Sequence, residues 1–118
     1  MTEIKTENYI IASMQDVSPQ PCPCGTTRRA FVDEDNDVAT FHLLQVDNDA
    51  QTHYHKTLTE IYYFLEGEGH MELDGEMIPV KPMTAIMIKP GCRHRAVGNF
   101  KILITAMPPF DPEDEWFD

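Results

Sequence analysis

Residues 53–67 carry the stretch HYHKTLTEIYYFLEG, which combines two closely spaced histidines with an apolar run. On an extended strand, His53 and His55 share a face, with Cβ atoms about 6.6 Å apart. Two imidazoles placed in this way can converge on one metal ion. The short connection at 56–59 then leads to a strand over 60–65, which starts at Glu60. Alternation places Glu60, Tyr62 and Phe64 on one face of that strand, so a carboxylate can return to the histidines.

The rest of the chain reads as further short strands separated by turn residues. No segment shows sustained helical periodicity, and nine prolines interrupt the chain. Asp74-Gly75 predicts a hairpin because both residues tolerate a positive φ, and Gly98-Asn99 predicts a second one. Many short strands at close spacing favour an all-β sandwich or barrel. The expected strands are 38–46, 60–65, 70–74, 84–89, 93–97 and 100–107, with weaker candidates at 9–14 and 27–31.

Size and charge limit the class of protein. The chain has 118 residues and 13.5 kDa, which predicts one domain over 1–118, with N-terminal strands and a loop at 1–37 and an acidic tail at 108–118. The net charge of −11 repels phosphate backbones and anionic lipid, so nucleic acid and membrane surfaces are not expected as partners. No apolar run is long enough to span a membrane. Residues 1–5 do not resemble a secretion signal, and we expect a cytoplasmic protein.

Three cysteines, an odd number, do not predict a disulfide framework. Prolines surround Cys22-Pro23-Cys24, which favours a loop with two free thiols; a redox or accessory metal role is the alternative. Cys92 is interpreted as a small buried apolar residue or, alternatively, as part of the pocket lining. His42 lies in the expected strand 38–46 and can face inward or outward.

Two segments together resemble the motifs of the cupin superfamily. His53-x-His55-x4-Glu60-x6-Gly67 is similar to the first motif, and Pro90-Gly91-Cys92-Arg93-His94 followed by Asn99 is similar to the second. The similarity covers residues 47–99. It implies a single cupin jelly-roll β-barrel, also called a double-stranded β-helix. It also implies one divalent metal ion per chain, bound by His53, His55, Glu60 and His94. The departures from the pattern lie at turn positions and concern loop geometry rather than the ligand set: Asp47, Met83, Lys89 and Gly98.

Three imidazoles and one carboxylate suit Fe, Mn, Zn, Ni or Cu, and the sequence does not select among them. The resemblance favours a metalloenzyme that acts on a small organic molecule by dioxygenase-like oxidation. Sugar or sugar-phosphate isomerase or lyase chemistry is the alternative within the enzymes. A non-catalytic metal-binding or ligand-binding barrel is the alternative outside them.

Further residues are assigned around the expected metal. Glu60 is a candidate general base as well as a ligand, and Tyr62 is the favoured residue for contact with the substrate. Phe64 and Cys92 are candidates for the pocket lining. Arg28 and Arg93 are interpreted as solvated residues at strand edges or, alternatively, one of them receives an anionic substrate group at the barrel mouth.

Two apolar segments predict contacts beyond the central motifs. Residues 116–117 place Trp and Phe in the acidic tail, which we therefore expect to dock on the barrel or on a partner subunit. Unpaired sheet edges and the apolar segment 9–11 predict a homodimer.

Overall fold

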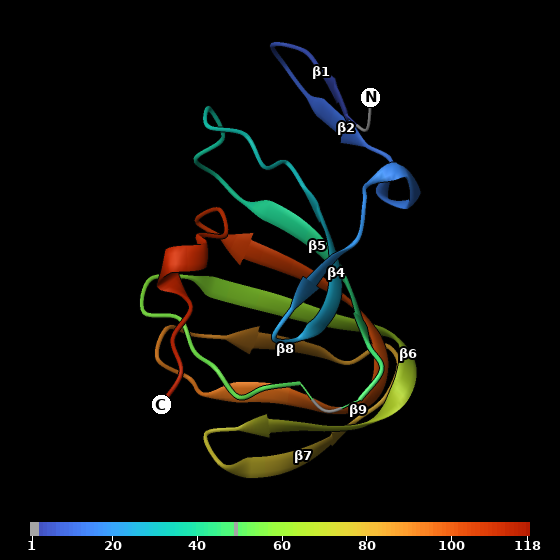
Figure 1. Cartoon of the computed structure of the whole chain (residues 1–118), viewed down its shortest axis with the longest axis vertical. Helices are drawn as coiled ribbons and strands as arrows, with labels where there is room; N and C mark the ends of the chain where they lie inside the picture. Colours follow the sequence, from blue (N-terminus) through green and yellow to red (C-terminus); the bar gives the residue numbers. More distant parts are fainter. Residues whose placement is uncertain (1–2, 49) are drawn as a thin grey trace.

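Two long strands organise the fold (Figure 1). The structure is a computed structural model that describes residues 3–48 and 50–118. β6 (Thr59–Leu73) and β9 (His94–Met107) pair antiparallel from end to end. The first half of β6 also pairs with β8 (Ala85–Ile88), and its second half pairs with β7 (Glu76–Val80). The two long strands therefore run through both layers of the barrel. This is the jelly-roll β-barrel implied by the resemblance, which is confirmed.

The remaining strands extend one edge of this sheet. β5 (Thr40–Val46) pairs with the second half of β9, β4 (Gly25–Ala30) pairs with β5, and β3 (Gln20–Cys22) pairs with β4. All the strand pairs are antiparallel. The strands predicted at 38–46, 60–65 and 84–89 correspond to β5, the start of β6 and β8.

Glycines explain why β6 and β9 bend without breaking. Gly67, at a φ of 105°, faces Phe100 across the ladder, and Gly69 faces Gly98, which has a φ of 128°. A Cβ atom on Gly67 would lie 2.0 Å from the Asn99 carbonyl oxygen, so only glycine permits this approach. The hairpin predicted at Gly98-Asn99 is therefore wrong: the chain passes through as one bent strand. The hairpin predicted at Asp74-Gly75 is confirmed, because these residues connect β6 to β7 with φ values of 49° and 86°.

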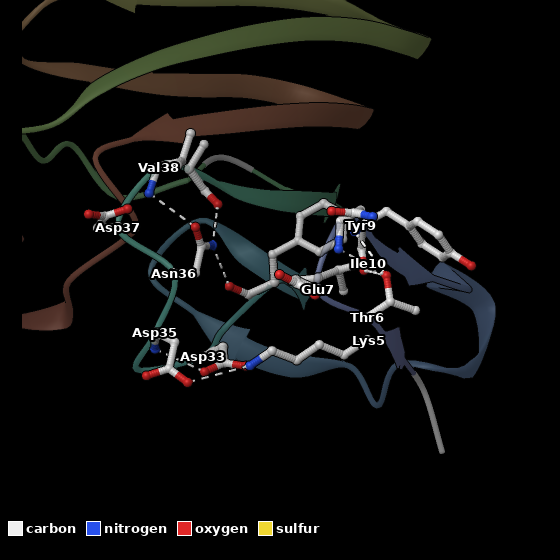
Figure 2. A pocket seen from close by; sticks show the side chains of 13 residues that line it. Lys5, Thr6, Glu7, Tyr9, Ile10, Asp33, Asp35, Asn36, Asp37 and Val38 are labelled. Carbon is white, nitrogen blue, oxygen red and sulfur yellow. Dashed lines mark hydrogen bonds and ion pairs between the residues drawn. The ribbon is translucent and has the colours of Figure 1, made fainter.

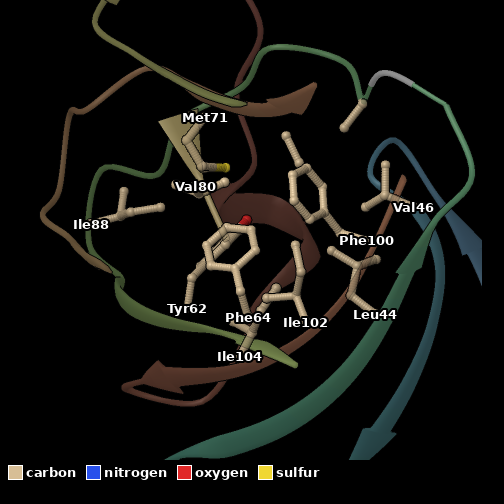
Figure 3. Close-up of a cluster of buried hydrophobic side chains, with 12 residues drawn as sticks. Leu44, Val46, Tyr62, Phe64, Met71, Val80, Ile88, Phe100, Ile102 and Ile104 are labelled. Atoms are coloured by element: carbon tan, nitrogen blue, oxygen red, sulfur yellow. The ribbon is translucent and has the colours of Figure 1, made fainter. Parts of the chain in front are cut away.

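The core fills the barrel interior, as Figure 3 shows. Phe64 and Phe100 pack edge to face at its centre, with ring centroids 5.0 Å apart. The predicted alternation in β6 is confirmed, because Glu60, Tyr62 and Phe64 are buried whereas Tyr63 and Leu65 are exposed. The apolar side chains fill one part of the interior and leave the polar ones grouped near the start of β6.

The N-terminal residues form a separate hairpin that projects from the barrel in Figure 1. It consists of β1 (Glu3–Lys5) and β2 (Ile10–Ala12), and the 3-10 turn η1 (Met14–Asp16) follows it. A cavity of about 510 Å³ separates the hairpin from the loop at 33–39, where Lys5 pairs with Asp33 and Asp35 (Figure 2). The second 3-10 turn, η2 (Pro112–Asp114), lies near the C-terminus. Neither described helix has the length and apolar character that a membrane crossing requires.

Candidate metal centre

Four buried side chains meet at one end of the barrel. His53 and His55 lie on the segment before β6, Glu60 lies at the start of β6, and His94 is the first residue of β9. His53 and His94 form an isolated bridge, with amide-to-carbonyl distances of 3.1 and 2.9 Å in the two directions. One ligand atom from each of the four side chains lies within 4.8 Å of the others. The structure therefore brings together all four metal ligands expected from the sequence.

Backbone carbonyl groups orient the three imidazoles. The Nδ1 atoms lie 2.9, 2.7 and 2.9 Å from the carbonyl oxygens of Gln51, Asp114 and Cys92, for His53, His55 and His94 respectively. A carbonyl only accepts, so each Nδ1 carries the hydrogen, and in the neutral form of each ring Nε2 has a free lone pair. In this arrangement a neutral histidine can bind a metal ion through Nε2 while the hydrogen bond at Nδ1 holds the ring in place.

The inward-facing atoms fit a cation. Nε2 of His55 and Nε2 of His94 lie 3.1 and 3.2 Å from Oε1 of Glu60. These three atoms are buried and have no hydrogen-bond partner among the described residues. Buried polar atoms are normally satisfied, and a divalent ion would satisfy all three at once. These four residues can therefore hold one metal ion.

Burial and proximity determine the charges in the site. Burial lowers the pKa of His53 to about 4, and the nearby His94 adds to this effect. Burial alone would raise the pKa of Glu60, but the imidazoles of His55 and His94 hold that pKa well below its usual range. Burial likewise opposes charge on His55, yet the Glu60 carboxylate outweighs it and raises the His55 pKa. The site thus holds an ionised carboxylate among imidazoles, which favours a cation at its centre.

The acidic tail docks across the mouth of the barrel, and we call residues 110–118 the C-terminal strap. The Asp114 carboxylate accepts hydrogen bonds from the backbone amides of Lys56, Thr57 and Leu58, at 2.9, 3.0 and 3.1 Å. Its backbone carbonyl is the partner of His55 Nδ1. One residue of the strap therefore fixes both the loop before β6 and a metal ligand.

Two further contacts fasten the strap. Trp116 forms a backbone bridge with Tyr54, with N to O distances of 2.9 and 3.0 Å. Asp118 accepts hydrogen bonds from the Arg93 guanidinium at 3.0 and 3.1 Å. That guanidinium also stacks on Tyr54, 3.5 Å from the ring centroid. The strap is therefore held along residues 54–58 and at Arg93.

A cavity of about 30 Å³ adjoins the ligands beneath the strap. This space admits only one or two water molecules. Apolar side chains line one part of it, namely Leu44, Ile104 and Phe110. The polar lining includes Arg29, His42 and Glu115 in addition to three of the ligands.

The structure separates the other expected site residues. Tyr62 lines this cavity, and its ring lies edge-on to His94 with centroids 5.8 Å apart. Phe64 and Cys92 instead pack in or against the apolar core and are not among the lining residues. Arg28 points away from the cavity and donates to the carbonyl groups of η1 and Val17. Arg93 lies on the strap side, bound to Asp118.

The prediction that Cys22 and Cys24 are free thiols is wrong, because a disulfide joins these residues. The turn between β3 and β4 brings the two side chains together, and both line the cavity beside the metal ligands. The odd number of cysteines pointed away from a disulfide framework but did not exclude one local pair.

Sequence reasoning missed two polar residues of the cavity, Arg29 and Glu115, and left open the direction of a third, His42. Arg29 and His42 face inward because they alternate with their neighbours on β4 and β5. Glu115 reaches the site from the strap, 3.8 Å from Nε2 of His53. Alternation from Thr27 along β4 is the signal that could have selected Arg29 instead of Arg28. No periodic signal marks Glu115, because its position depends on where the strap docks.

Comparisons with known proteins agree with this geometry. The model of the family described as the cupin domain matches residues 40–101, which is more than half of the chain and includes all four ligands. A solved structure of a protein from Planctomyces limnophilus superposes with a TM-score of 0.85 and 38% identity, covering 91% of this chain and 95% of that one.

Two curated relatives share a shorter region. An uncharacterized protein of Methanocaldococcus jannaschii is 41% identical over 76 residues, which are 61% of this chain and 61% of that protein. The L-ectoine synthase of Aliivibrio fischeri is 34% identical over 68 residues, which are 56% of this chain and 53% of the synthase. The matched region therefore spans only about half to three fifths of the length of these relatives.

Proposed function

Because this chain belongs to the cupin-domain family, we propose that it is a metal-dependent enzyme acting on a small organic molecule. The metal ligands are His53, His55, Glu60 and His94. The observation that carries the proposal is the arrangement of the three imidazoles. Each Nδ1 lies within hydrogen-bond distance of a backbone carbonyl oxygen, and Nε2 of His55 and Nε2 of His94 face the Glu60 carboxylate. When bound there, a divalent ion supplies a Lewis acid that polarises an oxygen atom of the substrate.

The residues beyond the ligands support acid–base chemistry. Glu115 and His42 line the cavity next to the metal site, and carboxylate and imidazole are the side chains that most often move protons in enzymes. Elimination or isomerisation needs such groups close to a polarised oxygen. The similarity to L-ectoine synthase supports a reaction outside the oxidations as well. We therefore favour elimination or isomerisation of a small polar molecule.

Dioxygenase-like oxidation is the second candidate. Leu44, Ile104 and Phe110 form an apolar part of the lining that suits O₂. Oxygen consumption during turnover separates the two candidates, because elimination and isomerisation consume none.

Glu60 has two proposed roles, as a ligand and as a general base. Glu60→Gln keeps an oxygen ligand and removes the base. If Glu60 transfers the proton, this variant retains most of its metal and loses turnover by ~10²–10⁴-fold. Full turnover in Glu60→Gln would leave Glu60 as a ligand only.

Elemental analysis tests the metal site directly. Protein purified without chelator or nickel resin should carry one equivalent of a divalent metal, and His55→Ala and His94→Ala should each lose it. His70→Ala is the matched control, because His70 lies on β6 with its side chain exposed. Full metal content and affinity in both ligand variants would refute the site. A metal-loaded protein without turnover on sugars, hydroxy acids and amino-acid derivatives would favour a non-catalytic binding barrel.

A further inference from the structure

Arg29 brings a positive charge to the wall of the metal cavity. It lies on β4, and its side chain is half-buried and lines the same cavity as His53, His55 and Glu60. The centre of its guanidinium lies 4.5 Å from the ring centroid of Phe110. Stacking of this kind covers one face of the guanidinium and leaves the donors at its edge available.

The guanidinium of Arg29 forms no ion pair within the described residues. Burial lowers its pKa, although the Glu115 carboxylate lies near enough to favour its charge and acts to raise that pKa. Among residues 3–48 and 50–118, the ion pairs of arginine involve Arg93 and Arg95 but not Arg29. The Arg29 Nε atom is buried and has no hydrogen-bond partner within these residues. A buried charged donor without a partner is costly, so a group that supplies an acceptor would bind favourably.

Glu115 does not serve as the hydrogen-bond acceptor of the Arg29 guanidinium. Its carboxylate lines the same cavity, but it lies 3.8 Å from Nε2 of His53 and forms no ion pair with Arg29. Arg28, the neighbour on β4, donates instead through Nη1 to the backbone carbonyls of Met14, Gln15 and Val17. Of the two adjacent arginines, one is a structural donor and the other has unused donors facing the metal site.

We propose that Arg29 binds a carboxylate of the substrate, so that the site selects small organic acids held between the metal ion and Arg29. This inference rests on the proposed metal-dependent function and adds the chemical class of its substrate. A carboxylate matches the paired donors of one guanidinium. A doubly charged phosphate usually needs several donors, and the neighbouring Glu115 carboxylate would repel it further. The site therefore favours one carboxylate over one phosphate.

The test compares carboxylates with their amides. Succinate and succinamate differ by one charge and have nearly the same shape, and malonate with malonamate and glutarate with glutaramate extend the series. Binding of each pair to manganese-loaded protein is measured by calorimetry. The wild type should bind the better-fitting diacid roughly ten- to hundredfold more tightly than its monoamide.

Arg29→Gln should abolish that preference while the metal content stays at one equivalent. Arg29→Lys keeps the charge without the paired donors and should reduce the preference, so the test survives if Arg29→Gln fails to fold. Arg95→Gln is the control, because Arg95 pairs with Glu72 and does not line the cavity. This variant should keep the full preference for the diacid. Equal preference in the wild type and the Arg29 variants, or no preference in the wild type for any pair, would overturn the proposal. A protein that fails to bind metal would overturn the proposed function instead.

Discussion

The backbone carbonyl of Asp114 lies 2.7 Å from Nδ1 of His55, so the C-terminal strap orients a ligand of the metal site from 59 residues away in the sequence. The same residue holds the loop at 56–58 through its carboxylate. The strap is thus part of the architecture of the site as well as its cover.

Asp114→Ala should weaken metal binding although Asp114 is not a ligand. Loss of the carboxylate frees three backbone amides and loosens the strap, so the carbonyl no longer holds the His55 ring. Loss of such a supporting contact typically reduces metal affinity by 10–100-fold. Chelator competition measures this affinity. Glu113→Ala, an exposed change in the same turn, is the control, and equal affinity in both variants would separate the strap from the metal site.

The strap should open before the barrel unfolds. The cavity of about 30 Å³ is too small for an organic acid, so a substrate enters only when the strap moves. Polar contacts with limited burial fasten the strap, and such segments open at low free energy. Trp116 is the single tryptophan and lies on the strap. The Nζ atom of Lys56 lies 3.6 Å from the centroid of its ring. Its emission should shift to the red at a lower urea concentration than the loss of β-sheet circular dichroism. Coincident transitions would show that the strap and barrel unfold together.

The site was predictable where local patterns determine it. Alternation in residues 60–65 placed Glu60 and Tyr62 inward, and the spacing of His53 and His55 placed two imidazoles on one side. Contacts between distant segments were not predictable. Gly98 reads as a turn in the sequence, but it pairs with Gly69 in a continuous bent ladder. Glu115 joins the cavity only because the strap crosses the mouth, which depends on hydrogen bonds to residues 56–58.

Acid should destabilise the metal-free protein partly through His42. Burial lowers the His42 pKa to about 4, below the 6.5 that is usual for histidine, so the unfolded chain binds more protons between these two pH values. Stability from this group is therefore complete above about pH 6.5 and is lost as the pH falls toward 4, by on the order of 3 kcal/mol. His53 acts in the same direction, whereas His55, whose pKa is raised, opposes it. Urea unfolding of His42→Gln should show a smaller loss of stability than the wild type over this pH range. An unchanged pH dependence in His42→Gln would show that His42 is already protonated in the folded state.

Gly67→Ala should be severely destabilising because the bend of β6 leaves no room for a side chain. The added Cβ atom would lie 2.0 Å from the Asn99 carbonyl oxygen, at a φ of 105°. Gly75→Ala is the matched control: its φ is 86°, but nothing lies within 4 Å of the added atom. The control should lose only the backbone cost of about 1–2 kcal/mol. Thermal unfolding should rank the two variants far apart, and equal losses would mean that the two strands can shift to accept a side chain at the bend.

The homodimer expected from the sequence leads to the last prediction. The hairpin of β1 and β2 stands away from the barrel as a separate two-stranded sheet, and such hairpins are marginal on their own in water (Figure 1). Ile4, Tyr9 and Ile11 are more than half exposed on it, at 60%, 56% and 53%. Pairing with a second copy would bury these side chains and cover the edges of the hairpin, because a C₂ interface presents the same patch twice.

Light scattering should therefore give twice the chain mass of 13.5 kDa at micromolar concentration. Ile11→Glu should shift the protein to the monomer, whereas Met87→Glu, an exposed change on β8, should leave the dimer intact. A wild-type mass near that of one chain would refute the predicted dimer, and the hairpin would then be available to another partner.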